Sequence, residues 1–290
     1  MVIHWIEKMI LNFKNLARRI LLSRKLNRHI LPFIKLMSPL ISTDLAGRLP
    51  VYGKICIKYS DNVMFFMLSN GDDEIVSKLY LKGIQGYEYE TVQFILRICE
   101  EMDYNMVFMD IGANTGFYSL LISSIFKHST VYAFEPYLKA FNRMIENINL
   151  NKFRNIQAFP VAMDEISGSV CFTNFDTHIG ISTTNKVIFS NFINCKYDKV
   201  SSVSIDDFIL NQNMQKIDLI KIDVEEHYER VLKGGKETFQ NLRPIIICEV
   251  FSQKRITEFI KFCEYEVLGI KDHLNAILIP SEKIQKIKYK

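Results

Sequence analysis

The chain has 290 residues, which is enough for one large domain or for a domain with a smaller extension. Apolar residues make up 48% of it and charged residues 23%, a composition that excludes a disordered protein. The formal net charge of +4 is too small to indicate a nucleic-acid-binding protein, and no basic groove rich in aromatic residues can be read from the sequence. No apolar run reaches the ~20 residues that a membrane span requires, and no signal peptide is expected.

The six cysteines have no paired spacing, and several lie in apolar runs such as "IIICEV". This pattern favours reduced, buried thiols over a disulfide framework or a zinc site. It therefore predicts a reducing compartment and a cytoplasmic protein.

The N-terminal segment predicts a basic amphipathic helix. Residues 2–23 follow the i, i+3, i+4, i+7 rule, and residues 1–40 carry eight basic side chains against the single acid Glu7. Pro32 and Pro39 are expected to prevent a long continuation of this helix. Two interpretations stay open: the helix packs on the protein or on a second subunit, or it lies on anionic lipid as a peripheral membrane contact.

The remaining patterns predict two regions. The runs "VYGKICIKY" and "VMFFML" predict a β-hairpin, so residues 1–80 form an extension made of the helix and this hairpin. From residue 81 to 290, short apolar runs alternate with helical patterns, which is typical of a doubly wound, mostly parallel sheet covered on both faces. Strands are expected at residues 106–111, 130–135, 156–163, 217–223, 244–250, 265–270 and 275–280, and helices at 88–102, 116–127, 138–150 and 253–263.

The run "DIGANTG" leaves the first of these α/β strands, where open sheets bind their ligands. Gly112 and Gly116 let the backbone turn sharply and approach a ligand, and Asn114 tolerates left-handed dihedral angles. The spacing differs from the G-x-G-x-x-G of dinucleotide-binding loops, which disfavours an NAD-dependent oxidoreductase. The carboxylate of Asp110 would repel a pyrophosphate, but it suits the ammonium and sulfonium groups of S-adenosylmethionine (SAM).

Glu135 ends the second strand, 23 positions after Gly112. An acid at this point can accept hydrogen bonds from both hydroxyl groups of an unphosphorylated ribose. The loop, Asp110 and the run "FEP" together predict a SAM-binding protein. The structural alternative is a glycine turn beside a solvated acid in some other α/β protein.

The chain resembles the FkbM-type SAM-dependent methyltransferases. The matching segments are "DIGANTGFYS", "AFEP", "VSIDDF", "LIKIDVE", "VLKG" and "RPIIICEV", in the family's order. The resemblance implies the seven-stranded, Rossmann-like fold of class I methyltransferases, with an antiparallel last strand. It also implies methyl transfer, typically to oxygen, on sugars or small molecules of polysaccharide or natural-product pathways. By position, it implies that the cofactor is held by Asp110, Gly112, Asn114, Gly116 and Glu135, with Asp164 at the adenine end.

Three residues near the end of the fourth strand are candidate catalytic bases. His227 is favoured by its ordinary pKa and Asp223 by its position at the strand end, while Glu225 lies between them. Asp223, Glu225 and Glu249 could instead hold Mg²⁺, which would acidify a hydroxyl group. The structural alternatives are a helix cap for Asp223 and solvated side chains for the others. Lys221, inside the strand, is a candidate partner for one of these acids.

The chain departs from the family pattern after "DVE". The family usually has a glycine there and a glutamate two positions later, whereas this chain has Glu226 and Tyr228. The departure allows altered substrate choice or a weakened enzyme. The first prediction is therefore an O-methyltransferase acting on a saccharide or small metabolite. The alternative is a non-catalytic methyltransferase-fold protein that docks in a membrane-associated assembly through residues 2–23.

Overall fold

The computed structural model describes residues 24–102, 105–173, 188–190, 198–269 and 275–285. The chain divides into two compact units, one ending at Tyr87 and one beginning at Glu88. The helix expected at residues 2–23 lies outside the described residues. No helix among the described residues is long and apolar enough to cross a lipid bilayer.

The N-terminal unit contains the predicted hairpin. β1 (Tyr52–Lys58) pairs antiparallel with β2 (Met64–Asn70), and buried side chains alternate with more exposed ones, as in strands with one covered face. The helix α4 (Glu74–Lys82) was not predicted. It begins at Asp73, whose carboxylate accepts a hydrogen bond of 2.9 Å from the amide of Val76, the usual way to cap a helix start.

The helix α2 (Arg24–Leu36) continues through Pro32, so the expectation that this proline limits a helix is wrong. Pro32 is exposed, and Asn27 and Leu31 are buried against the rest of the unit. Tertiary packing therefore overrides the local cost of a proline inside a helix. A short 3₁₀ turn, η1 (Ser38–Leu40), and the helix α3 (Thr43–Arg48) follow.

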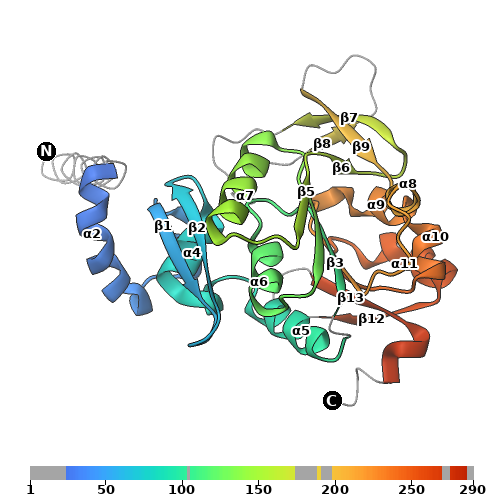
Figure 1. Ribbon diagram of the computed structural model, residues 1–290, viewed down its shortest axis with the longest axis horizontal. Helices are drawn as coiled ribbons and strands as arrows, with labels where there is room; N and C mark the ends of the chain where they lie inside the picture. Colours follow the sequence, from blue (N-terminus) through green and yellow to red (C-terminus); the bar gives the residue numbers. More distant parts are fainter. Residues whose placement is uncertain (1–23, 103–104, 174–187, 191–197, 270–274, 286–290) are drawn as a thin grey trace, which may run out of the picture. The chain divides into compact units, whose positions relative to one another are not determined.

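The larger unit is built around a seven-stranded sheet (Figure 1). In spatial order its strands are β12 (Tyr265–Gly269), β13 (Asn275–Pro280), β11 (Ile245–Glu249), β10 (Leu219–Ile222), β3 (Val107–Ile111), β4 (Thr130–Phe134) and β5 (Ile156–Phe159). β13 runs antiparallel to both of its neighbours, and β11, β10, β3, β4 and β5 pair in parallel. The doubly wound, mostly parallel sheet with an antiparallel last strand is thereby confirmed.

Helices flank this sheet (Figure 1). They are α5 (Tyr89–Glu100), α6 (Phe117–Ile125), α7 (Leu138–Asn151), α8 (Ile205–Asn211), α9 (Tyr228–Lys233), α10 (Lys236–Asn241) and α11 (Gln253–Cys263). Successive residues of the central strands, such as Phe108 and Met109, are both fully buried. Since neighbouring side chains on a strand point to opposite faces, both faces of the sheet are covered, and the continuous apolar runs of the sequence follow from this.

The third predicted strand, residues 156–163, divides at Pro160. Residues before it form β5 of the large sheet, and β6 (Ala162–Met163) joins a second sheet, because proline has no amide hydrogen for the ladder. The second sheet has the order β6-β9-β7-β8 and was not predicted. Its other described strands are β7 (Gly168–Thr173), β8 (Ile188–Ser190) and β9 (Asp198–Val203).

The described cysteines differ in their redox state. Cys56, Cys99, Cys248 and Cys263 carry free thiols, as predicted, whereas Cys171 on β7 is disulfide-bonded. The expectation of a reduced thiol is wrong for Cys171, because a disulfide depends on which cysteines come together in space and not on their spacing in the sequence.

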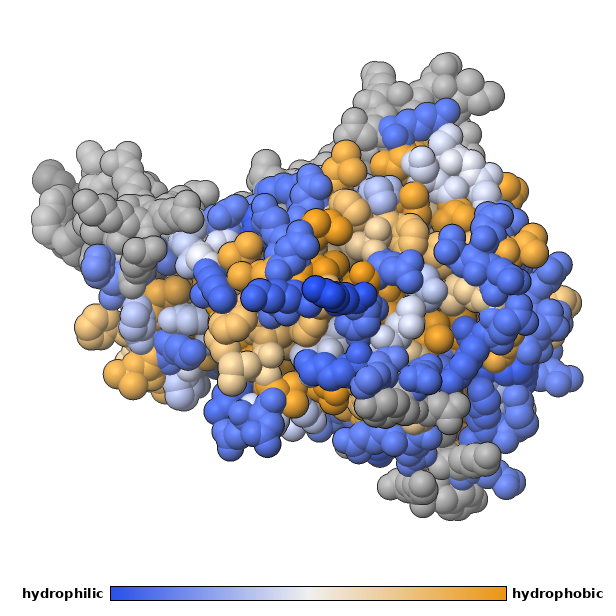
Figure 2. Space-filling model, viewed as in Figure 1, coloured by the Kyte–Doolittle hydropathy of each residue, from blue (hydrophilic) through white to orange (hydrophobic). Residues whose placement is uncertain are grey.

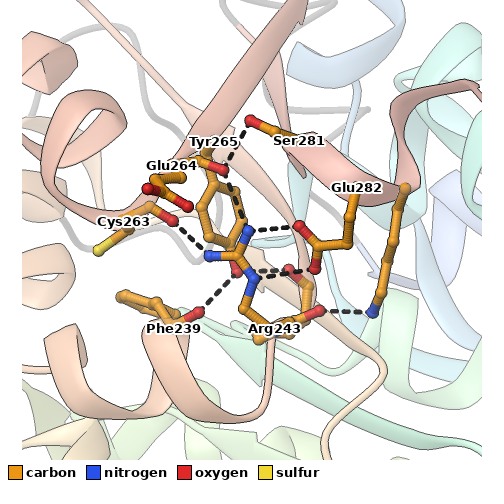
Figure 3. A network of polar contacts seen from close by, with 9 residues as sticks. Phe239, Arg243, Cys263, Glu264, Tyr265, Ser281 and Glu282 are labelled. Atoms are coloured by element: carbon orange, nitrogen blue, oxygen red, sulfur yellow. Dashed lines mark hydrogen bonds and ion pairs between the residues drawn. The ribbon is translucent and has the colours of Figure 1, made fainter.

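Arg243 ties the C-terminal part of the unit together (Figure 3). Its guanidinium donates to both carboxylate oxygens of Glu282, at 2.9 and 2.5 Å, and to the carbonyl groups of Cys263 and Glu264. Lys283 donates in turn to the carbonyl of Arg243 at 2.6 Å. Paired, charge-assisted hydrogen bonds of this kind are strong and directional. The arginine that opens the motif "RPIIICEV" is therefore a structural residue that fixes the chain around β11.

Candidate functional site

The glycine loop, residues 112–116, connects β3 to α6. The amides of Gly112 and Ala113 both donate to the carbonyl of Phe134 at 3.0 Å, which ties the loop to the end of β4. Gly112, Asn114 and Gly116 all have positive φ angles, of 81°, 51° and 91°. The sequence predicted left-handed backbone for this turn, and glycine and asparagine are the residues that adopt it at least cost.

The two glycines also make room for the protein itself. A Cβ on Gly112 would lie 1.9 Å from the carbonyl oxygen of Asp223, and one on Gly116 would lie 2.9 Å from Cγ of Met144. The amide of Asp223 donates to the carbonyl of Ile111 at 2.9 Å. Gly112 thus allows the end of β10 to approach the loop, which brings Asp223 beside the predicted cofactor residues.

Asp110 lies near the end of β3 and is almost fully buried. Its Oδ2 accepts hydrogen bonds from the amide of Ser119 at 3.0 Å and from its hydroxyl at 2.6 Å. Burial raises the pKa of Asp110 to about 6, although Ser119 and Lys221 act in the opposite direction. Both of these bonds use Oδ2, so Oδ1 is the oxygen that can meet a cationic group of a ligand.

Glu135 follows β4 and faces the loop. Its Oε2 accepts from the amide of Asn114 and its Oε1 from the amide of Tyr137, each at 2.8 Å. Burial raises its pKa to about 7, and these two hydrogen bonds only partly offset that rise. Within the described chain, the buried Oδ1 of Asn114 accepts no hydrogen bond. The loop is therefore lined by acceptors, which fits the ammonium group and ribose hydroxyls of SAM.

Lys221 is fully buried on β10, opposite Asp110 of β3 in the register. Its Nζ lies 3.2 Å from Oδ2 of Asp223, 3.2 Å from Oδ1 of Asn275 and 3.9 Å from Oε2 of Glu88. Burial alone would lower the pKa of this lysine, but Asp223, Glu88 and their neighbours outweigh burial and raise it above its ordinary value. The ammonium group is therefore charged, as the predicted pairing with an acid requires.

Glu88 completes this network and was missed by the sequence. Its Oε2 accepts from the hydroxyl of Tyr118 at 2.6 Å and from Nδ2 of Asn275 at 3.2 Å. Tyr118 lies inside the motif "DIGANTGFYS", and Asn275 is a polar residue that opens an apolar strand, so both carried a signal. No motif or pattern in the sequence points to Glu88, which precedes α5 and has a φ of 41°.

Asp223, Glu225 and Glu249 form an acidic group at the ends of β10 and β11. Burial and the charge of Asp223 raise the pKa of Glu225 to about 7 and also raise that of Glu249, which hydrogen-bonds to Asp223. Among the described residues, no three His, Cys, Asp or Glu side chains are arranged to hold a metal ion. The Mg²⁺ hypothesis is therefore not supported, and Lys221 supplies a positive charge beside Asp223.

Asp164 and His227 form a separate group with Arg230. Asp164 accepts from Nε of Arg230 at 2.6 Å and Nη2 at 3.3 Å, and its Oδ1 lies 3.2 Å from Nε2 of His227. Burial would raise the pKa of Asp164, but the hydrogen bonds from His227 and Arg230 outweigh it and lower the pKa to about 2. The carboxylate of Asp164 is thus engaged by the guanidinium of Arg230 and lies beside His227, and its place at the adenine end stays a prediction. His227 groups with Asp164, whereas Asp223 groups with Lys221.

The two departures from the family pattern have different environments. Glu226 is exposed, while Tyr228 is fully buried in the core and donates from its hydroxyl to the carbonyl of Ser252 at 3.4 Å. Glu225, just before them, has a φ of 52°, so the backbone adopts the left-handed form without a glycine. Tyr228 is thus a packing residue, and the acidic side chains of this segment are those of Glu225 and Glu226.

A family model described as "Methyltransferase FkbM domain" matches residues 110–267. The chain is 26% identical over 167 residues to "Hexuronic acid methyltransferase AglP" of Haloferax volcanii, covering 58% of this chain and 64% of that protein. It is 26% identical over 161 residues to "Methyltransferase 1" of Beauveria bassiana, covering 50% of this chain and 65% of that protein. Each match thus spans less than two thirds of the relative's own length.

Among solved structures, the chain resembles a methyltransferase FkbM from Methylobacillus flagellatus, with 12% identity and a TM-score of 0.46, over 87% of this chain and 59% of that one. It also resembles M. jannaschii TYW2 in complex with AdoMet, with 14% identity and a TM-score of 0.37, over 79% and 86%. The family model covers more than half of the 290 residues and its motifs lie at the loop and strand ends described above, so the chain belongs to the FkbM methyltransferase family.

Proposed function

We propose that the protein transfers the methyl group of SAM to a hydroxyl group of a saccharide or a similar hydroxylated metabolite. One observation carries the proposal: a left-handed glycine loop lies with two buried carboxylates, Asp110 and Glu135, at the ends of the neighbouring strands β3 and β4. Family membership supports methyl transfer. The relative AglP, named for hexuronic acid, supports a saccharide acceptor.

The residues of the loop divide between the two ends of SAM. Asp110 would meet the cationic amino acid end through Oδ1, and Glu135 would accept the ribose hydroxyls. Gly112, Asn114 and Gly116 would shape the loop between them. When bound, SAM supplies a methyl group already activated by its sulfonium. Asp164 would lie at the adenine end, with its carboxylate engaged by Arg230 and beside His227.

Glu225 is the candidate that best fits a general base. Its pKa of about 7 lies close to neutral pH, where a base can both exist in its ionised form and accept a proton. It would take the proton of the acceptor hydroxyl, while Asp223, held by Lys221, would orient that hydroxyl. Alkali treatment of a product carrying a labelled methyl group distinguishes the acceptors, since a methyl ester of a carboxylate is cleaved and a methyl ether of a hydroxyl is not.

Two substitutions test the cofactor site by calorimetry. Asp110→Asn is expected to weaken SAM binding at least about tenfold while leaving the binding of adenosine unchanged, because adenosine lacks the cationic end. Glu135→Gln is expected to weaken both ligands, because both carry the ribose. Both replacements keep the shape of the side chain, so each removes mainly the negative charge.

Other outcomes would contradict this assignment. No heat with SAM or its demethylated product in the unchanged protein would overturn the proposal and favour a non-catalytic methyltransferase-fold protein. If Asp110→Asn lost affinity for adenosine and for SAM equally, this would show that Asp110 supports the fold of the loop and does not contact the ligand.

The raised pKa values of the two acids predict that SAM binding depends on pH. Asp110 and Glu135, with pKa values of about 6 and about 7, are ionised above those values and protonated below them. The affinity for SAM should therefore be full near pH 8 and should fall by at least about tenfold on going to pH 5. Titration calorimetry between pH 5 and pH 8 measures the affinity. An affinity for SAM that does not change with pH would contradict the proposal that ionised Asp110 and Glu135 bind the cofactor. In Glu135→Gln, the loss of SAM affinity near pH 7 should disappear, whereas the loss of affinity near pH 6 should remain.

A further inference from the structure

A group of exposed apolar side chains lies on the N-terminal unit, at the end of α2 and on η1. Phe33, Leu36, Met37 and Leu40 are between 52% and 79% exposed, and they are called the α2 patch below. Figure 2 shows apolar surface over this end of α2, at the left of the view. Single exposed apolar residues are ordinary, but four within eight positions indicate a surface that contacts something else.

The other side of α2 is fixed to its own unit. Asn27 and Leu31 are buried, and Nδ2 of Asn27 donates to the carbonyl of Pro50 at 2.8 Å. Nζ of Lys35 lies 4.4 Å from the centroid of the Tyr80 ring. The helix is therefore held by specific contacts on one side, and the α2 patch is left on the side that the unit does not use.

The net charge of the segment that carries the patch indicates its partner. Residues 24–42 contain the basic residues Arg24, Lys25, Arg28 and Lys35 and no acidic residue. The remainder of the chain holds 32 basic and 32 acidic side chains. The charge of residues 24–42 therefore equals the formal net charge of the whole chain, +4. A second copy docking through the same patch would bring like charges together. An anionic lipid surface offers both the apolar medium and the opposite charge.

We propose that the α2 patch inserts into the surface of a membrane that contains anionic lipid, with α2 lying in the plane of the interface. No helix among the described residues, α2 included, is long and apolar enough to cross a hydrocarbon core of ~30 Å. The helix therefore binds at the interface, where the apolar side chains of the α2 patch enter the acyl region and the net positive charge of residues 24–42 is attracted by the anionic headgroups. This surface is distinct from residues 2–23, and it is independent of the proposed methyl transfer.

Vesicle sedimentation of the full-length protein tests this surface. The protein should sediment with phosphatidylcholine vesicles that contain phosphatidylglycerol and not with phosphatidylcholine alone, and binding should weaken as salt is added. The double variant Leu36→Glu, Leu40→Glu should reduce the bound fraction at least about tenfold, because it removes apolar contacts and adds negative charge. The matched control is Ile166→Glu, Leu210→Glu, which makes the same change at exposed positions of the larger unit and should bind like the unchanged protein.

Three results would overturn the proposal. The first is equal sedimentation of the patch variant and the unchanged protein, which would assign any binding to another segment. The second is equal binding to vesicles with and without phosphatidylglycerol. The third is a dimer, measured by light scattering without lipid, that the patch variant converts to a monomer, since this would assign the patch to a second copy. Thermal unfolding of both double variants, expected to match the unchanged protein because all four positions are exposed, establishes that the comparison is between folded proteins.

Discussion

Lys221→Met is expected to lower the free energy of unfolding by about 3–5 kcal/mol, the usual effect of removing one partner of a buried ionic group. Lys221 is fully buried, and its Nζ contacts Asp223, Asn275 and Glu88. Methionine fills a similar volume but leaves the carboxylates of Asp223 and Glu88 without their cation. Urea unfolding at neutral pH, monitored by circular dichroism, measures this decrease in the free energy of unfolding.

Two further variants separate charge from packing. Lys58→Met removes an exposed lysine that pairs with Asp61 at 2.7 Å, and it should change stability by less than about 1 kcal/mol. Adding Glu88→Gln to Lys221→Met should restore part of the loss, because fewer uncompensated charges then remain buried. A double variant no more stable than Lys221→Met would show that the ammonium of Lys221 does not compensate Glu88.

Gly112→Ala is expected to destabilise the larger unit by about 3–4 kcal/mol and to abolish SAM binding. Its φ of 81° is strained for alanine, and the new Cβ would lie 1.9 Å from the carbonyl oxygen of Asp223. Because the contact is with backbone, either the glycine loop or the end of β10 has to move. Urea unfolding and SAM calorimetry measure the two effects.

Gly53→Ala is the matched control for this prediction. Gly53 also has a positive φ, of 104°, but a Cβ there would meet nothing within 4 Å. Gly53→Ala should lower the free energy of unfolding only by the cost of the backbone conformation, about 1–3 kcal/mol, and it should leave the affinity for SAM unchanged. If Gly112→Ala cost no more than Gly53→Ala and still bound SAM, the close packing of Asp223 on the loop would have no energetic importance.

The geometry of the glycine loop was predictable because it depends on neighbouring residues. Asp110, Gly112, Asn114, Gly116 and Glu135 are recognisable because a strand end, a positive φ angle and an acid each leave a mark on neighbouring positions in the sequence. The structure brings Asn114 against Glu135 and Asp223 against Gly112, as the parallel order of the strands requires.

Three contacts of the site could be found only in the tertiary structure. Asp164 was expected at the adenine end, and Arg230, 66 positions away, donates to its carboxylate. His227 was chosen for its ordinary pKa, yet it groups with Asp164. Glu88 carried no signal, because its partner Asn275 is 187 positions away. In each case the deciding contact joins residues that are distant along the chain.

The sequence by itself determined the alternation of strands and helices, the mostly parallel class of the large sheet, the glycine loop and the resemblance to the family. These follow from hydrophobic period, turn chemistry and motif spacing, all of which act between near neighbours. Only the tertiary structure decided the second sheet, the passage of α2 through Pro32, the buried network of Lys221 and the partners of Asp164. The physical reason is that burial and charge compensation are set by whichever distant segments pack together, and these can override any local preference.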